Sequence, residues 1–138
     1  MSRLQGKASM SVEEYRALAG AHGLRPKYGN KQCIVDGRRF DSLLEGRRYQ
    51  RLAWLRGQGF IKWFLCQVPF RLPGGITYRV DFLIRWSQEA ILQGLSTEVL
   101  TLEDAKGMLT DKSRIKIRQV EEIYGETVTL INKRNVDS

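Results

Sequence analysis

The amino-acid sequence predicts a mixed α/β domain in which helices flank a mixed central sheet, with the element order α-β-β-β-α-β. Two segments space their apolar residues as one face of a helix does, and each starts with a capping residue and stops at a glycine. Three runs rich in β-branched and aromatic residues lie between these segments, and a fourth run follows the second one.

The length of 138 residues suits one domain that buries a core without disulfide bonds. We expect a tail and a short helix over residues 1–25, the single domain over 26–132 and a C-terminal tail over 133–138. Cys33 and Cys66 lie among apolar or strand-like residues and are interpreted as reduced core thiols. No apolar run approaches the ~20 residues of a membrane span, so we expect a soluble, cytoplasmic protein.

The first expected helix begins with a capping box formed by Ser11 and Glu14 and ends at Gly20. Further along, the dipeptide Asp36-Gly37 favours a tight hairpin turn between β-prone residues. A small hairpin is therefore predicted before the main helix.

The main helix is predicted to start in the segment 40–45 and to end at Gly57 and Gly59. Its inward stripe is expected to contain Leu44, Tyr49 (or Arg48), Leu52 and Leu55. Three arginines lie largely off this stripe and should face solvent or a ligand: Arg47, Arg51 and Arg56.

Residues 61–72 and 76–84 flank the turn sequence Pro73-Gly74-Gly75 and are predicted to be neighbouring antiparallel strands. Residues 86–96 are weakly patterned and fit a loop, a short helix or a hairpin extension, and a third strand is expected over 95–105.

The second helix is predicted to open at Thr110 and to end at Gly125. Its inward residues are expected to be Ile117, Val120, Ile123 and Tyr124. Residues 127–131 should form the last strand.

The formal net charge is +8, and most of the excess lies between Arg25 and Lys62, where ten lysines and arginines accompany only three acidic residues. The same stretch contains tyrosine, phenylalanine and tryptophan, which can stack on bases. This composition favours a polyanion such as DNA, whereas a charged run by itself can also be a solvated surface.

Two of the predicted strands carry acidic residues where buried strands carry apolar ones: Asp81 in one, and Asp104 with Lys106 in the other. A buried carboxylate is costly unless a cation, a metal or a hydrogen-bond network compensates it. Because side chains alternate along a strand, Asp104 and Lys106 share one face and Glu103 points the other way. A register slip of one residue would exchange Glu103 with Asp104.

Two carboxylates and an ammonium converge if these two strands are neighbours. Hard oxygen ligands of this kind suit Mg²⁺, which can polarise a phosphodiester and make a bound water a better nucleophile. Lys106 could orient that water or neutralise charge that develops on the phosphate.

This arrangement resembles the PD-(D/E)xK nuclease superfamily, through Glu45 on the first core helix, Asp81 on the second core strand and Asp104-Ala105-Lys106 on the third. A wider pattern of short segments between Lys27 and Gly107 is similar to a family of small, mostly uncharacterised phage proteins within that superfamily. It also resembles the phage endonuclease I type of Holliday-junction resolvase, which shares a helix glutamate, a Tyr-x-x-Asp-Phe strand and an acid-x-Lys-Gly strand end. The resemblance covers roughly residues 26–125, and it departs from the superfamily at Val80, where proline often precedes the acid.

The resemblance implies a restriction-endonuclease-like core in which residues 26–132 form one nuclease domain. It implies that Mg²⁺, or Mn²⁺ in its place, is held by Asp81, Asp104, the carbonyl group of Ala105 and Glu45. The implied catalytic residues are Asp81, Asp104, Lys106 and Glu45.

DNA contacts are expected from basic residues near the start of the domain and on the second helix, and from Gln67, which lies on the strand where related nucleases place a polar residue near the metal. These residues are Lys27, Lys31, Arg38, Arg39, Arg47, Arg48, Arg51, Gln67, Lys112, Arg114, Lys116 and Arg118.

Each candidate also has a structural interpretation. Asp81 could pair with Arg79 or Arg85 at a strand edge, and Asp104 with Lys106 could be an exposed charge pair. Glu45 could return to the backbone of Ser42 as part of a capping box, and the basic residues of the second helix could be a solvated face.

The sequence and the resemblance together predict a Mg²⁺-dependent DNA endonuclease that leaves a 5′-phosphate and prefers branched DNA such as a four-way junction. Symmetric cutting of a junction predicts a homodimer. We expect no membrane partner, and we expect the protein to act inside a phage-infected or prophage-bearing bacterium. The alternatives are a nuclease for linear or nicked duplex DNA in repair, packaging or host-DNA degradation, and a non-catalytic DNA-binding module on a nuclease fold.

Overall fold

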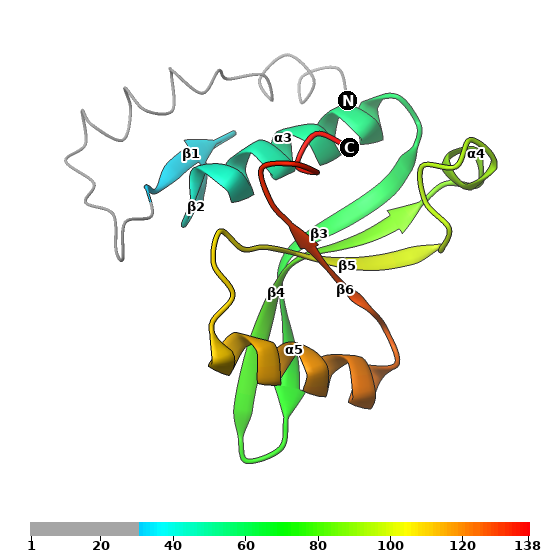
Figure 1. The fold of residues 1–138 in the computed structure, drawn as a ribbon. Coiled ribbons are helices and arrows are strands. Elements are labelled where there is room, and N and C mark those ends of the chain that lie inside the picture. Colours follow the sequence, from blue (N-terminus) through cyan, green and yellow to red (C-terminus); the bar gives the residue numbers. More distant parts are fainter. Residues whose placement is uncertain (1–30) are drawn as a thin grey trace.

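The computed structural model describes residues 31–138 (Figure 1). The helix expected from Ser11 to Gly20 therefore lies outside the described residues, as does the expected tail before it. The described elements are β1 (Cys33–Val35), β2 (Arg38–Phe40), α3 (Leu43–Gly57), β3 (Ile61–Leu72), β4 (Ile76–Trp86), α4 (Gln88–Leu92), β5 (Leu100–Ala105), α5 (Asp111–Tyr124) and β6 (Val128–Ile131).

The central sheet has the strand order β3-β4-β5-β6. β3 pairs with β4 and β4 with β5 in antiparallel fashion, whereas β5 and β6 are parallel. The parallel pair is possible because α5 carries the chain back between its two strands. The α/β class, the mixed sheet flanked by helices and the order α-β-β-β-α-β from α3 to β6 are confirmed, with the short α4 added between β4 and β5.

The small hairpin β1-β2 turns at the predicted dipeptide. Asp36 and Gly37 have φ angles of 50° and 76°, so both adopt the left-handed conformation that a two-residue hairpin turn of this type requires. The hairpin packs against α3 through Cys33, Val35 and Phe40. Both cysteines are free thiols, as predicted.

Helix α3 begins at the cap that the sequence indicates, because the Ser42 hydroxyl accepts a hydrogen bond from the Glu45 backbone N–H at 3.1 Å. The inward stripe is turned relative to the prediction, since Leu44 is only half-buried. The buried positions of the helix are Glu45, Gly46, Arg48, Tyr49, Leu52 and Leu55. Two charged residues thus occupy the stripe, which apolar periodicity alone cannot predict.

Figure 1 shows α3 and α5 at opposite ends of the long β3-β4 hairpin. An apolar core lies under each of these two helices. The core under α3 includes Tyr49, Leu52, Leu55, Phe64, Phe82 and Ile84. The core under α5 includes Leu72, Tyr78, Val80, Leu102, Ile117, Val120 and Val128. On β4 the change from one core to the other occurs between Val80 and Phe82, so Asp81 lies at the boundary.

Helix α5 buries Ile117 and Val120 as predicted, but the prediction for the next turn is wrong. Ile123 is 50% exposed and Tyr124 is 42% exposed. Tyr124 lies at the edge of the sheet, where its ring packs on Phe70 and its hydroxyl donates to the Arg71 carbonyl at 2.8 Å. Within residues 31–138, neither this helix nor any other has the length and apolar character to cross a membrane.

Residues 86–96 include the short helix α4, whose cap is Ser87, and β5 begins at Leu100, five residues later than predicted. The C-terminal segment also differs from the prediction of a tail, because Val136 is completely buried. The carbonyl groups of Val136 and Ser138 accept hydrogen bonds from Arg48 at 3.0 and 2.9 Å. Residues 133–138 therefore pack beside α3 (Figure 1).

Candidate functional site

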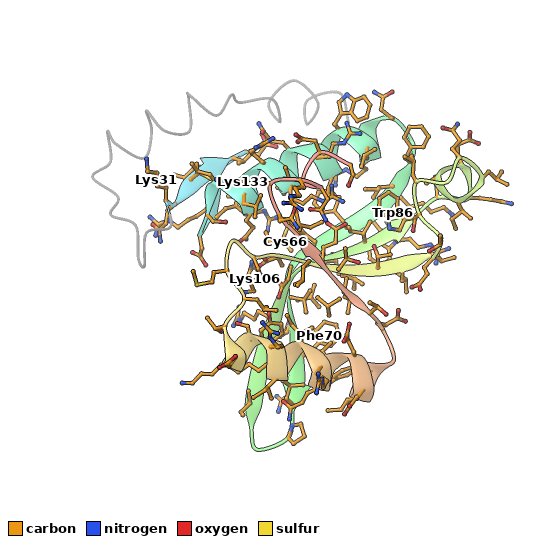
Figure 2. All side chains as sticks on the ribbon, in the orientation of Figure 1. Lys31, Cys66, Phe70, Trp86, Lys106 and Lys133 are labelled. Carbon is orange, nitrogen blue, oxygen red and sulfur yellow. The ribbon has the colours of Figure 1, made fainter. Side chains whose placement is uncertain are left out.

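Polar side chains from four adjacent elements meet at the boundary between the two cores. α3 supplies Glu45, β3 supplies Gln67, β4 supplies Asp81 and β5 supplies Asp104. Lys106 directly follows β5, and Figure 2 shows it near the middle of the molecule between α3 and α5. The structure therefore brings the four predicted catalytic side chains into one cluster.

Gln67 joins the carboxylates of Glu45 and Asp81. Its Nε2 atom donates to Glu45 Oε2 at 2.9 Å and to Asp81 Oδ1 at 3.0 Å. Its φ angle of 55° is strained for a residue with a side chain. In the antiparallel pairing of β3 with β4, Cys66 pairs with Phe82 and Val68 pairs with Val80. Gln67 of β3 therefore lies opposite Asp81 of β4.

Asp81 and Asp104 close the end of the β4-β5 ladder with their carboxylates. The regular pairing stops at Phe82 and Glu103. Beyond it the Asp81 N–H donates to Asp104 Oδ1 at 2.9 Å, and the Ala105 N–H donates to Asp81 Oδ2 at 2.8 Å. These bonds explain how the two acids are buried, because each carboxylate satisfies a backbone N–H that has left the ladder.

Asp104 is completely buried and also accepts a hydrogen bond from the Tyr78 hydroxyl. The Lys106 ammonium lies 4.0 Å from Asp104 Oδ2 and 5.8 Å from the centre of the Tyr78 ring. The Lys106 side chain is 29% exposed, so it lies between solvent and the buried pair of Tyr78 and Asp104. Two structural interpretations are therefore wrong: Asp104 is not part of an exposed pair, and Asp81 bonds to Gln67 and Ala105 rather than to a neighbouring arginine.

Sequence reasoning did not assign a site role to Tyr78. The Tyr-x-x-Asp-Phe pattern contained the signal, but it does not reveal that the hydroxyl reaches a residue on another strand. Burial is the main cause that raises the pKa of Tyr78, and the hydrogen bond to Asp104 raises it further. The phenol therefore stays protonated and donates to Asp104.

The cluster contains more negative than positive charge. Burial, and then the charge of Asp81, raises the pKa of Glu45 to about 8. Burial and the charge of Asp104 raise the pKa of Asp81 to about 7, although the Ala105 N–H and Lys106 oppose this shift. Carboxylates with raised pKa values bind either protons or a cation at neutral pH.

The donor chemistry of the cluster fits a hard divalent cation, since Glu45, Asp81 and Asp104 supply carboxylate oxygens and Ala105 a carbonyl oxygen. Among residues 31–138, however, no three acidic, histidine or cysteine side chains are grouped as a ready metal site. The amide of Gln67 lies between two of these carboxylates, because its nitrogen donates hydrogen bonds to Glu45 and to Asp81. A half-turn of this amide would present its oxygen in place of the nitrogen.

The expected DNA contacts are distributed over two parts of the molecule. Lys27 lies outside the described residues. Lys31, Arg38 and Arg39 are exposed at the hairpin, and Lys112, Arg114 and Arg118 are exposed on α5, where Lys116 is half-buried. Two residues of α3 have other partners: Arg47 pairs with Asp137 at 2.7 Å, and the guanidinium of Arg51 lies 4.6 Å from the centre of the Trp54 ring.

Arg48 contradicts its prediction as a DNA contact, because it is only 3% exposed. Its Nε and Nη2 atoms donate to the two carboxylate oxygens of Glu103, both at 2.6 Å. Strand alternation already placed Glu103 on the other face of the sheet from Asp104. Because a buried acid needs a cation, a pairing of Glu103 with Arg48 could have been considered. Which cation meets Glu103 depends on how α3 packs on the sheet.

A model of one protein family matches residues 25–135, a range that contains every residue of this cluster. Neither the curated proteins nor the solved structures include a match to this chain. Because the family match covers well over half of the sequence, the chain belongs to the family described as "Protein of unknown function (DUF1064)".

Proposed function

We propose that this protein is a Mg²⁺-dependent endonuclease that hydrolyses phosphodiester bonds in DNA and prefers branched DNA such as a four-way junction. The observation that supports it most is the buried cluster of Glu45, Asp81 and Asp104 beside the ammonium of Lys106. An acidic cluster that lacks enough positive charge of its own has a use for a divalent cation, and the basic surface supplies affinity for a polyanion.

Asp81, Glu45, Asp104 and the carbonyl group of Ala105 would hold the metal ion. Bound Mg²⁺ would supply Lewis-acid polarisation of the phosphate and stabilise charge on the departing oxygen. Tyr78 keeps the Asp104 carboxylate in place through its hydrogen bond. Lys106 is partly exposed and close to Asp104, so its ammonium can orient the attacking water or neutralise charge on the phosphate.

A four-way junction contains two strands that must be cut symmetrically. Two copies of the site are needed for this reaction, and a homodimer with two-fold symmetry supplies them. Sedimentation of the protein with and without a junction tests this part of the proposal, and a single copy on each cleaved junction would contradict it.

The central test is cleavage of a labelled four-way junction in Mg²⁺ by the wild type, Asp104→Asn and Lys106→Met. We expect each substitution to lower the cleavage rate at least about 100-fold, because each removes a group that contacts the metal or the reacting phosphate. Glu122→Gln and Lys133→Met, at exposed positions, are the matched controls and should cut like the wild type. Thermal unfolding of each variant verifies that it is folded.

The outcomes separate the candidate functions. Equal cleavage of a linear duplex and a junction supports the alternative nuclease of repair, packaging or host-DNA degradation. One observation favours the non-catalytic DNA-binding module, namely the Gln67 amide between Glu45 and Asp81. If the wild type binds DNA but cuts nothing with Mg²⁺ or Mn²⁺, that alternative replaces the nuclease, and normal cleavage by both variants would show that the site is elsewhere.

A further inference from the structure

An open pocket of about 380 Å³ lies beside the acidic cluster, between α3, the end of the β1-β2 hairpin and the outer strand β3. This volume falls within the ~300–1,000 Å³ of small-molecule sites. Apolar side chains form much of its lining, among them Phe64, Leu65, Val68 and Pro69. The pocket is therefore larger and more apolar than a site for a bare phosphate ion needs to be.

Among the described residues that line this pocket, two are arginines and none is acidic. The Arg38 guanidinium carbon lies 5.9 Å from the centre of the Tyr49 ring, and that of Arg56 lies 5.0 Å from the centre of the Phe64 ring. The ion pairs found within residues 31–138 involve neither of them. Both positive charges are thus held by aromatic rings and remain available to an anion.

The pocket shares a wall with the acidic cluster. Gln67 lines the pocket and donates hydrogen bonds to Glu45 and Asp81. Cys66 lies next to it, and Figure 2 labels this residue near the centre of the molecule. Burial raises the pKa of Cys66, Arg38 and Arg56 lower it, and Glu45 and Asp81 raise it, so this thiol lies within the electrostatic reach of both sites.

We propose that the pocket binds the nucleotide that flanks the bond being cut, with its phosphate between Arg38 and Arg56 and its sugar and base against Leu65, Val68 and Pro69. This assignment rests on the proposed nuclease function, because the acidic cluster on the other side of Gln67 would then hold the scissile phosphate. The pairing of positive charge with an apolar wall matches a nucleotide, which joins an anion to a flat apolar ring.

Cys66 provides a direct test that needs no cleavage. The chain has two cysteines, of which Cys33 is 1% exposed and Cys66 is half-buried at the pocket. The alkylation rate of Cys66 by iodoacetamide is measured at one pH, in EDTA, with a 5′-phosphorylated thymidine tetranucleotide as the probe. At a probe concentration roughly ten times its dissociation constant, the rate should fall about tenfold, since only the free protein reacts.

Arg38→Gln and Arg56→Gln should each remove most of this protection, whereas Arg134→Gln, an exposed arginine outside the pocket lining, should retain it. Cys33 reports on folding, because it becomes reactive only in a variant that has lost the core. Equal loss of protection in all three variants would overturn the pocket assignment in favour of general charge attraction. Equal protection by inorganic phosphate at the same concentration would overturn the nucleotide assignment.

This test and the cleavage test fail independently. Protection of Cys66 without cleavage in Mg²⁺ or Mn²⁺ keeps the nucleotide site and rejects the nuclease. Cleavage of DNA without protection of Cys66 keeps the nuclease and rejects this site.

Discussion

Buried acids at the boundary of the two cores are the main feature at the scale of single residues. Asp81 and Asp104 replace the ladder hydrogen bonds that β4 and β5 lose as they separate. The Glu45 carboxylate instead accepts its hydrogen bond from a side chain, the amide of Gln67. Burial raises the pKa of both the Glu45 and the Asp81 carboxyl groups, and these are the two groups that the Gln67 amide joins.

The pKa values predict how stability depends on pH. The pKa of Glu45 rises from 4.5 to about 8 in the folded protein, and that of Asp81 from 3.8 to about 7. The folded state therefore binds these protons more tightly than the unfolded state. Their contribution to stability is complete below pH ~4 and is lost as the pH rises to about 8.

Thermal unfolding in EDTA over this pH range measures the effect as the Tm difference between the wild type and Glu45→Gln. As the pH rises, the Tm of the wild type should fall by several degrees relative to the Tm of Glu45→Gln, because only the wild type must ionise a buried carboxyl group at this position. A difference of one pKa unit corresponds to about 1.4 kcal/mol of stability. Glu122→Gln, at an exposed position, should follow the wild type. A Tm difference that stays constant with pH would contradict the raised pKa of Glu45.

At the scale of elements, the close packing of α3 against the β1-β2 hairpin depends on one glycine, Gly46. A Cβ atom added at Gly46 would lie 2.5 Å from the sulfur of Cys33, a distance that real contacts do not tolerate. Gly46 therefore lets the helix approach β1 closely, and only a residue without a side chain allows this approach.

Gly46→Ala should destabilise the protein by about 1–3 kcal/mol, although alanine favours helices, because the helix must move away from β1. Urea unfolding measures the change. The double variant with Cys33→Ala should recover most of the loss, since it removes the sulfur that the new methyl group meets. Equal losses in the single and double variants would show that the helix and hairpin are not in contact at this point.

Arg48 and Glu103 connect α3 to β5 through a buried ion pair, and Arg48 also holds the C-terminal segment. Arg48→Met should cost about 3–5 kcal/mol, because Glu103 is left buried and unpaired. Arg47→Met removes the exposed pair with Asp137 and should cost at most about 1 kcal/mol.

Urea unfolding of both variants compares the two pairs, which come from adjacent residues of one helix. The double variant Arg48→Met with Glu103→Leu should regain much of the stability, since neither charge remains to be compensated. An Arg48→Met variant as stable as Arg47→Met would contradict the buried geometry.

At the scale of the whole molecule, the net charge of +8 predicts DNA binding that weakens steeply with salt. The exposed arginines of β2, Arg38 and Arg39, should contribute to it because they lie at the end of the molecule that carries the proposed nucleotide pocket. Each phosphate contact adds about 0.9 to the slope of log affinity against log salt concentration.

Replacement of Arg38 and Arg39 by glutamine should therefore reduce the slope for a duplex by about 2. Fluorescence anisotropy in EDTA, over a range of salt concentrations, measures it. The double variant Lys133→Gln with Arg134→Gln removes the same charge from the C-terminal turn and should leave the slope unchanged. Equal slopes for the wild type and both double variants would place the DNA on another surface, such as α5.

Local patterns allowed much of this fold to be predicted. The Asp36-Gly37 turn, the Ser42 cap and the bounds of β3 follow from short-range chemistry that each segment carries within itself. The prediction that Ile123 and Tyr124 of α5 are buried was wrong. A helix that lies over only part of the sheet leaves its end exposed, and the sequence of the helix does not reveal where the sheet ends.

The sequence by itself determined the fold class and the separation of Asp104 from Glu103, because strand alternation is a property of the backbone. Only the tertiary structure decided what each acid meets: Gln67 for Glu45 and Asp81, and Arg48 for Glu103. The physical reason is that these partners lie on different elements, far apart in the chain. Their meeting depends on the packing of α3 against the sheet, which no local pattern encodes.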